Sequence, residues 1–193
     1  TIGTVEELGR SLKFDIIDLE GDLDEQFRGV EMVIGDVQDV HAVRAAMDGV
    51  EAVFHLAAWN GAPSARVSLE ELSRTNVEGT RNVVSAAAAA GVDRFVHFSS
   101  VKVLGETTDD RDHSTAAASA YAKSRLEAER LVMDVPGVSS FRACCLRLPL
   151  VLGLGHRGNL YRMLAAIDRA KFPPLPAVSN RRSLVHVEDV VQA

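Results

Sequence analysis

The chain has 193 residues, of which 47% are hydrophobic and 25% charged; this composition excludes a disordered protein and allows one sizeable core, or one domain with part of another. Its 27 acidic and 21 basic side chains give a net charge of -6 and are spread along the sequence, so no basic face is offered to nucleic acid. No apolar run approaches the roughly 20 residues of a membrane span, and the N-terminus lacks a signal-peptide pattern. These observations favour a soluble, cytoplasmic protein with no nucleic-acid or membrane partner.

Short apolar runs alternate along the chain with segments of helical periodicity. Strands are predicted at Phe14 to Leu19, Glu31 to Ile34, Ala52 to Leu56, Phe95 to Phe98 and Ala143 to Leu148. Helices are predicted at Val40 to Met47, Leu69 to Ala90, Tyr121 to Met133 and Leu160 to Ala170. This alternation predicts an α/β fold, a doubly wound parallel sheet of the Rossmann type covered on both faces, with ligands at the carboxyl ends of the strands.

The N-terminal residues do not show the strand and glycine-rich turn with which a dinucleotide-binding fold normally opens. We interpret Thr1 to Thr4 as the tail of that turn, with Gly3 as its last glycine and a first helix from Val5 to Leu12. The alternative is an unrelated start. In the first interpretation, Asp18 or Glu20 lies near the position of the acid that bonds an adenine ribose.

Small and acidic residues follow two of the predicted strands. Asp36 and Val37 come after one, and Ala57 and Ala58 come after Leu56 in the other. Asp36 is suited to accept a hydrogen bond from an adenine amino group with Val37 against the ring, while the alanines let a flat ligand approach the backbone. The alternative is that Asp36 caps the next helix and the alanines simply pack.

The segment around Tyr121 has the pattern of an active site that moves a hydroxyl proton. Tyr121 is predicted at the head of an amphipathic helix, and the preceding strand ends in Ser99 and Ser100. A phenol has an ordinary pKa near ~10, so removing a hydroxyl proton near neutral pH requires a positive neighbour that stabilises the phenolate. Arg125 stands one helical turn after Tyr121.

The cysteines and histidines give no sign of a metal site. Cys144 and Cys145 are adjacent in an apolar run and are expected to pack as small buried side chains in a reducing compartment. His55, His97 and His186 lie in apolar runs, where packed or capping histidines are expected, and no metal-ligand spacing is present.

Several motifs in this order resemble the extended short-chain dehydrogenase/reductase family, and within it the NAD-dependent epimerase/dehydratase group that acts on nucleotide sugars. The motifs are Gly35-Asp36-Val37-Gln38-Asp39, His55-Leu56-Ala57-Ala58, Asn76-Val77-Glu78-Gly79-Thr80, Phe98-Ser99-Ser100 with Val103-Leu104-Gly105, Tyr121, and Leu146-Arg147. The run Ser99 to Glu106, together with Asn180 to Leu184, is similar to sugar-nucleotide 4-epimerases and 4-keto-sugar reductases.

The resemblance implies an NAD- or NADP-dependent enzyme in which Ser100 and Tyr121 are catalytic and Arg125 occupies the position of the family's catalytic lysine. Ser100 and Asn159 would meet the nucleotide-sugar substrate, and the basic pair Arg181 and Arg182 either serves its phosphates or is simply solvated. The implied cofactor contacts are Asp36, Val37, Leu56, Ala57, Ala58, Asn76, Ser99, Tyr121 and Pro149.

Arg125 is the departure from the family pattern. A guanidinium is planar, bulkier than an ammonium and fixed in its donor geometry, so it does not reproduce a lysine faithfully. Lys123 is rotated by about 200° from Tyr121 on a helix. Lys102 should share the side of Ser100 by strand alternation, although a solvated loop lysine is the alternative.

The resemblance further implies a cofactor-binding domain over residues 1–150 and the start of a substrate-binding part over 151–193. The first strand and most of the C-terminal substrate domain are expected to be missing from this sequence. A homodimer is expected through the helices at Leu69 to Ala90 and Tyr121 to Met133. Because of Arg125, the alternative function is an NAD(P)-binding sensor or partner protein with little or no turnover.

Overall fold

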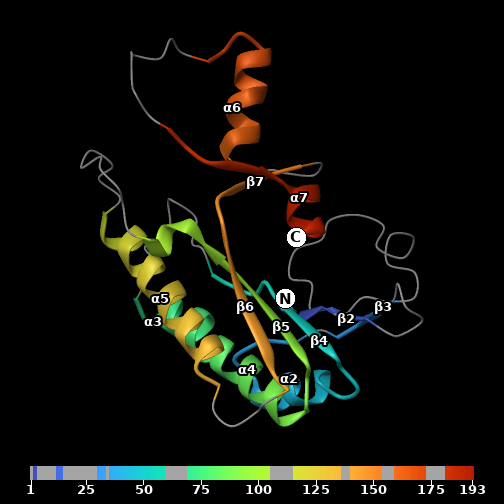
Figure 1. Cartoon of the computed structure of the whole chain (residues 1–193). Coiled ribbons are helices and arrows are strands. Elements are labelled where there is room, and N and C mark those ends of the chain that lie inside the picture. Colours follow the sequence, from blue (N-terminus) through green and yellow to red (C-terminus); the bar gives the residue numbers. More distant parts are fainter. Residues whose placement is uncertain are drawn as a thin grey trace. The chain divides into compact units, whose positions relative to one another are not determined.

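The computed structural model of the chain forms two compact units, Thr1–Arg147 and Leu148–Ala193 (Figure 1). It describes residues 2–3, 12–14, 30–33, 35–59, 69–104, 115–135, 140–153, 159–172 and 181–193. Asp18, Glu20 and most of the predicted helix from Val5 to Leu12 lie outside the described residues.

The first unit is built on a four-stranded sheet with the strand order β1-β4-β5-β6 (Figure 1). These strands are β1 (Ile2–Gly3), β4 (Ala52–His55), β5 (Arg94–Ser100) and β6 (Arg142–Leu148). Strands β4 and β5 are parallel, with Val53 opposite Phe95 and His55 opposite His97. A separate parallel pair consists of β2 (Leu12–Phe14) and β3 (Val30–Met32).

Helices follow the strands as the periodicity predicts. Helix α2 (Val40–Ala46) begins after Asp39, whose carboxylate accepts the backbone N–H groups of His41 and Ala42 at 2.9 and 3.2 Å. The predicted helix from Leu69 to Ala90 is a continuous run of α3 (Leu69–Leu72), the π-helical η1 (Ser73–Glu78) and α4 (Gly79–Ala89). The 3-10 turn η2 (Val101–Leu104) follows β5, and the long helix α5 (Thr115–Met133) precedes β6.

One face of the sheet carries the core of the first unit. Phe95, His97 and Ser99 alternate along β5 and are buried, and helices α4 and α5 lie on this side of the sheet (Figure 1). The buried apolar cluster consists of Val37, Val43, Met47, Val53, Val83, Val84, Ala86, Ala87, Val92, Phe95 and Val132.

The opposite face of the sheet carries aromatic side chains. The rings of Phe54 in β4 and Phe98 in β5 have centroids 6.5 Å apart, and Phe54 is 40% exposed. The described helices of this unit lie on the face that carries the core, and the parallel β4–β5 pair with flanking helices is the Rossmann-type α/β arrangement that the sequence predicts.

The second unit combines a short parallel pair with two helices. Strand β7 (Leu150–Leu152) pairs with β8 (Leu184–His186), and the helices are α6 (Asn159–Asp168) and α7 (Val187–Gln192). The Nδ1 atom of His186 accepts a hydrogen bond from the backbone N–H of Glu188 at 3.4 Å, so this histidine caps α7. Of the two expectations for His186, packing or capping, the structure shows the second. No helix among the described residues is long and apolar enough to cross a lipid bilayer.

Three expectations are corrected by the structure. Ile2 and Gly3 do not form the tail of a turn, because they are extended and pair antiparallel with His55 and Phe54. Helix α5 begins six residues before Tyr121, because the small residues from Thr115 onward continue the helix toward its N-terminus; Tyr121 is therefore inside the helix and not at its head. Cys144 is exposed and Cys145 half-buried, since their strand has one accessible side.

Candidate active site

Strand β5 ends in a serine, and the turn that follows it brings a lysine next to the tyrosine of α5. Ser100 is the last residue of β5, and its hydroxyl oxygen accepts the backbone N–H of Lys102 at 3.3 Å. The ammonium nitrogen of Lys102 lies 5.8 Å from the centroid of the Tyr121 ring, within the range of a cation–π contact. Ser100 and Tyr121 are both half-buried, so each keeps a surface that a ligand can reach.

Arg125 is turned into the protein. It is 1% exposed, and its Nη2 donates a hydrogen bond to the carbonyl oxygen of Phe98. Its Nε and Nη1 have no hydrogen-bond partner among the described residues. Burial lowers the pKa of Arg125, and the negative forms of Tyr121 and Glu129 oppose this effect. Arg125 therefore ties α5 to β5 and presents almost no surface to a ligand.

Asn76 joins the loop after β4 to the helix that carries Tyr121. Its Oδ1 accepts the backbone N–H of Trp59 at 2.7 Å, and its Nδ2 donates to the Trp59 carbonyl at 3.1 Å. The same Nδ2 donates to the Ser124 hydroxyl at 3.0 Å, and Ser124 donates to the Tyr121 carbonyl at 2.9 Å. Asn76 is fully buried, so it positions the loop and the helix, and in this arrangement it has no surface left for a cofactor.

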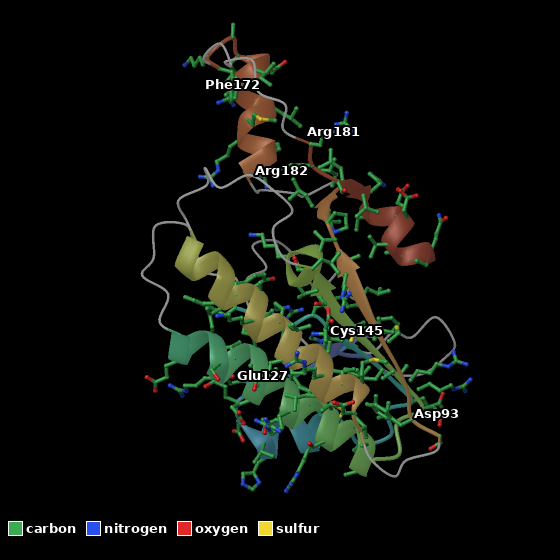
Figure 2. All side chains as sticks on the ribbon, turned by 60° about the vertical axis from the view of Figure 1, so that its left-hand side comes forward. Asp93, Glu127, Cys145, Phe172, Arg181 and Arg182 are labelled. Carbon is green, nitrogen blue, oxygen red and sulfur yellow. The ribbon has the colours of Figure 1, made fainter. Side chains whose placement is uncertain are left out.

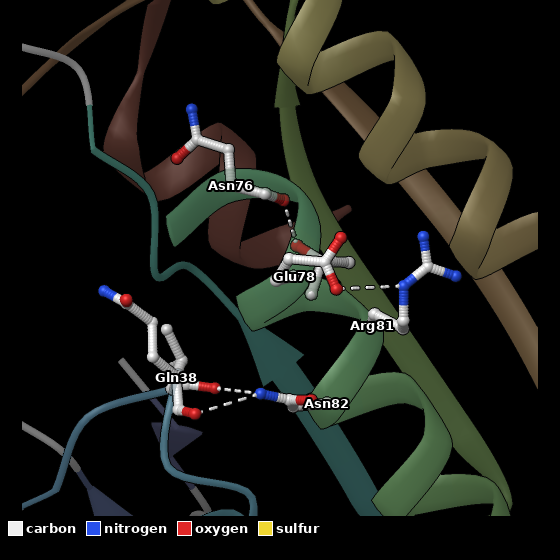
Figure 3. A network of polar contacts seen from close by, with 7 residues as sticks. Gln38, Asn76, Glu78, Arg81 and Asn82 are labelled. Carbon is white, nitrogen blue, oxygen red and sulfur yellow. Dashed lines mark hydrogen bonds and ion pairs between the residues drawn. The ribbon is translucent and has the colours of Figure 1, made fainter. Parts of the chain in front are cut away.

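The loop after β3 is held by α4 (Figure 3). Asn82 Nδ2 donates to the carbonyl oxygens of Val37 at 3.0 Å and Gln38 at 3.3 Å. Asp36 is exposed, and its Oδ1 accepts the Gln38 N–H at 2.8 Å, which closes the turn. Val37 is 4% exposed and packs so tightly on Gly79 that a Cβ there would lie 2.6 Å from Val37 Cγ2. Asp36 is thus available to a ligand, whereas the Val37 side chain is not.

Two buried histidines lie beneath this edge of the sheet. Thr80 donates its hydroxyl proton to the Asn76 carbonyl at 2.7 Å, so the 2.8 Å contact with His55 Nε2 requires the histidine nitrogen to be the donor. Burial lowers the pKa of His55 well below its ordinary value, and burial and Arg125 lower that of His97 to about 3. Both histidines are therefore neutral packed residues, as predicted.

An ion pair between Arg147 and Glu129 connects β6 to the C-terminal part of α5. Arg147 Nε lies 3.0 and 3.1 Å from the two Glu129 oxygens, and Nη2 lies 2.7 Å from Oε2. Burial raises the pKa of Glu129, but the hydrogen bonds from Arg147 and its positive charge outweigh burial and keep the pKa below its ordinary value. Burial also raises the pKa of the neighbouring Cys145 thiol to about 11 (Figure 2), so this cysteine is no nucleophile at neutral pH.

The structure brings some of the other predicted site residues to this edge and not others. Leu56 is 48% exposed, and Ala57 and Ala58 are half-buried in the loop that Asn76 holds. Ser99 is 7% exposed and turns to the opposite face from Ser100, toward Glu129. Pro149, between β6 and β7, and Asn159, the first residue of α6, belong to the second unit.

Sequence reasoning missed Ser124 and Asn82. Both are polar residues in helix interiors, where their hydroxyl or amide is expected to face solvent unless a backbone group of another element is close. A weak signal was available, since both share the buried stripe of their helix: Ser124 is four residues from Ala128, and Asn82 is four from Ala86.

A family model described as the NAD dependent epimerase/dehydratase family matches residues 10–193. The chain therefore belongs to this family, within the extended short-chain dehydrogenases/reductases. Its described fold, a parallel sheet with flanking helices, agrees with this membership.

The relatives act on different molecules. Over 98% of its length the chain is 28% identical to the 3beta-hydroxysteroid-dehydrogenase/decarboxylase isoform 2 of Arabidopsis thaliana, of which it covers 35%. Over 82% of its length it is 32% identical to the N-acetyl-alpha-D-glucosaminyl-diphospho-ditrans,octacis-undecaprenol 4-epimerase of Escherichia coli O157:H7, of which it covers 49%. The chain thus spans half or less of these relatives.

Among solved structures, the chain is similar to MoeE5 in complex with UDP-glucose and NAD. The TM-score is 0.68 at 26% identity, over 85% of this chain and 57% of that one. This likeness extends the family assignment to a structure that holds both a dinucleotide and a nucleotide sugar.

Proposed function

We propose that this protein is an NAD-dependent oxidoreductase that acts on a nucleotide-linked sugar, as a 4-epimerase or a 4-keto-sugar reductase. The observation that carries the proposal is the placement of Ser100 and Tyr121, both accessible, around Lys102 at the carboxyl end of β5. Family membership supports the cofactor, and the nucleotide-sugar ligand of MoeE5 supports the substrate class.

The residues at this edge of the sheet fit a dinucleotide. The exposed Asp36 carboxylate can accept further hydrogen bonds beside the one from Gln38, as an adenine amino group requires. Ala57 and Ala58 leave the backbone of the next loop accessible, and exposed Leu56 offers apolar surface to a ring. NAD, when bound here, accepts or returns the hydride at the reacting carbon.

The chain's own residues handle the proton. Tyr121, as a phenolate, removes the proton of the sugar hydroxyl while the carbon loses its hydride, which leaves a ketone and a neutral phenol. Ser100 accepts the Lys102 N–H, so its own hydroxyl proton is available to the oxygen on which charge develops. In the reverse direction Tyr121 returns the proton to the ketone oxygen.

Asn159 is proposed to meet the diphosphate of the substrate. It is the first residue of α6, and the N–H groups of a helix N-terminus favour an anion. Arg181 and Arg182, exposed just before β8, are proposed to assist (Figure 2), and Pro149 to pack near the nicotinamide.

Two other functions have an observation in their favour. The similarity to a plant 3beta-hydroxysteroid dehydrogenase supports a sterol hydroxyl as the alternative substrate. The burial of Arg125 supports a cofactor-binding protein with little turnover, because the side chain at the position of the family's lysine reaches no ligand.

Turnover assays with NAD and NADP separate these functions. The purified protein is incubated with UDP-glucose, with UDP-N-acetylglucosamine and with a 3β-hydroxysteroid, and products are identified by NMR and mass spectrometry. We expect turnover of a UDP-sugar, its loss in Tyr121→Phe and a fall of about 10²-fold or more in Ser100→Ala. Turnover of the steroid alone would replace the sugar proposal. Equal near-zero rates in the wild type, Tyr121→Phe and Ser100→Ala, with NADH still quenching the fluorescence of the single tryptophan Trp59, would establish the non-catalytic function.

We further propose a cytoplasmic homodimer. A groove between α4 and α5 is lined by Arg81, Ser85, Glu127, Arg130, Leu131 and Asp134. Charges of both signs on one surface suit a twofold axis, on which each basic group meets an acidic one of the other copy. The free thiols of Cys144 and Cys145 suit a reducing compartment. Light scattering should give twice the chain mass, and Leu131→Glu should halve it; an unchanged mass would contradict pairing through this groove.

A further inference from the structure

Two cations flank Tyr121 in the described structure, and they differ in accessibility. Lys102, on η2, is exposed, and its ammonium nitrogen lies 5.8 Å from the ring centroid. Arg125, one turn along α5, is 1% exposed and already donates to the Phe98 carbonyl. Because only the first can move to follow the phenol oxygen or a bound ligand, the two cations are suited to different tasks.

The turn that carries Lys102 is fixed at the serine. The Lys102 backbone N–H donates to Ser100 Oγ at 3.3 Å, so the lysine side chain starts at a defined point beside the serine. Its four-carbon stem then spans from that point to the ring, and an ammonium on a flexible stem can serve the hydroxyl edge as well as the face of the ring. One residue therefore contacts both groups that the proposed chemistry uses.

We propose that Lys102 is the positioning residue that supplies the positive charge for the Tyr121 phenolate, while Arg125 is a structural tether between α5 and β5. This inference rests on the proposed role of Tyr121 as the acid/base. It assigns to the strand-end turn the electrostatic task that the family pattern assigns to a lysine one turn along the helix.

Other charged groups around Tyr121 are less suited to this task. Lys123, two positions along α5, is exposed and rotated about 200° away. The charged side chains of α3 and η1, which pack against α5, include Glu70, Arg74 and Glu78, and all three are exposed. On β5, buried His97 is neutral because its pKa is lowered to about 3.

The chain allows a direct test, because it contains only two tyrosines, Tyr121 and Tyr161. In a Tyr161→Phe background, the ultraviolet absorbance change on phenol ionisation reports Tyr121 alone. We expect Lys102→Met to raise the midpoint of Tyr121 ionisation by about one pH unit or more. Lys102→Arg should bring the midpoint most of the way back to the wild-type value, because it keeps a positive charge within about 6 Å of the ring. The matched control Lys123→Met should leave the midpoint unchanged.

The same titration is carried out on Arg125→Met and Arg125→Lys. If Arg125→Met does not fold, Arg125→Lys provides the comparison. We expect smaller shifts from them than from Lys102→Met. The limb of the kcat/KM profile that reports Tyr121 should move with the midpoint in the Lys102 variants. This is the acidic limb for oxidation, which needs the phenolate, and the alkaline limb for reduction, which needs the neutral phenol. An unshifted midpoint in Lys102→Met, or a larger shift in the Arg125 variants, would overturn the inference.

The absorbance titration needs neither cofactor nor turnover, so it is independent of the proposed function. Activity that survives Tyr121→Phe would refute that function and leave the titration result standing. A shifted midpoint with an unmoved kcat/KM profile would overturn the positioning role of Lys102.

Discussion

The amide of Asn76 donates to the hydroxyl of Ser124 at 3.0 Å, across 48 positions of sequence, and so connects the π-helical η1 to the helix of Tyr121. All polar atoms of the Asn76 side chain are used, and the residue is fully buried. The loop after β4 and the helix α5 therefore depend on one side chain for their mutual placement.

Asn76→Ala should destabilise the protein by about 2–4 kcal/mol, because the Trp59 N–H and carbonyl lose their partners inside the protein. Ser124→Ala, the control, removes the hydrogen bonds of Ser124 to Asn76 and Tyr121 but leaves both Trp59 contacts in place, and it should cost about 1 kcal/mol. Urea unfolding followed by Trp59 fluorescence measures both. Equal effects of the two substitutions would show that the Trp59 contacts contribute nothing.

Gly79→Ala should destabilise the protein by about 1–3 kcal/mol, because the new Cβ would lie 2.6 Å from Val37 Cγ2. Removing the opposing methyl groups should relieve the overlap. In a double-mutant cycle, Gly79→Ala combined with Val37→Ala should be less costly than the sum of the two single changes. Additive costs would mean that the helix shifts away and no overlap occurs.

Arg147→Met should be more damaging than Glu129→Gln. The arginine side chain is 42% exposed and the glutamate 6%, so losing the arginine leaves a buried carboxylate alone, whereas losing the glutamate leaves a half-solvated cation. We expect urea unfolding at neutral pH to show a clearly larger loss of stability in Arg147→Met than in Glu129→Gln.

The pH dependence of this pair has a definite sign. The folded-state pKa of Glu129 is lowered, so its contribution is present above the unfolded pKa of about 4.3 and is lost as pH falls through the folded value. Unfolding at a series of pH values should show this loss in the wild type and not in Glu129→Gln. A cost of Arg147→Met that grows on acidification would contradict the assignment.

His97 should lower the free energy of unfolding already in mildly acidic solution. Its pKa is about 3 in the folded state, against about 6.5 unfolded, so stability is full above pH 6.5 and falls down to about pH 3 as the unfolded chain takes up the proton. The loss between pH 7 and 5 should be about 2 kcal/mol from this histidine. In His97→Leu, the free energy of unfolding should depend less on pH over this interval than in the wild type. An unchanged dependence would show that His97 binds its proton in the folded state.

Much of the fold was predictable because its strands are short apolar runs and its helices carry regular apolar stripes. Strand β4 and helix α2 were placed within a residue of their observed ends. The start of α5 was not, because Thr115 to Ala120 is a run of small residues with no periodicity to mark it. The antiparallel β1 was also missed, since two residues carry no pattern.

The candidate site was predictable in its residues more than in their orientations. Ser100 ends its strand, whereas Tyr121 lies inside α5 and not at its head, and their roles stay predictions. The burial of Arg125 and Asn76 depends on which backbone groups of other elements are left for them, and no local pattern encodes that. Lys102 was identified by strand alternation alone, and its ring contact required the path of η2.

The six-residue π-helical segment from Ser73 to Glu78 also fixes the rotation of the helix that follows it. A regular helix turns by about 100° per residue, so deleting one residue from this segment would rotate α4 by about that angle relative to α3. Gly79 would then no longer face Val37, and Asn82 would point away from the loop after β3. The length of this one irregular turn therefore sets the register between the loop after β3 and the helical layer, and a homologue that lacks one of its residues must hold that loop by other means.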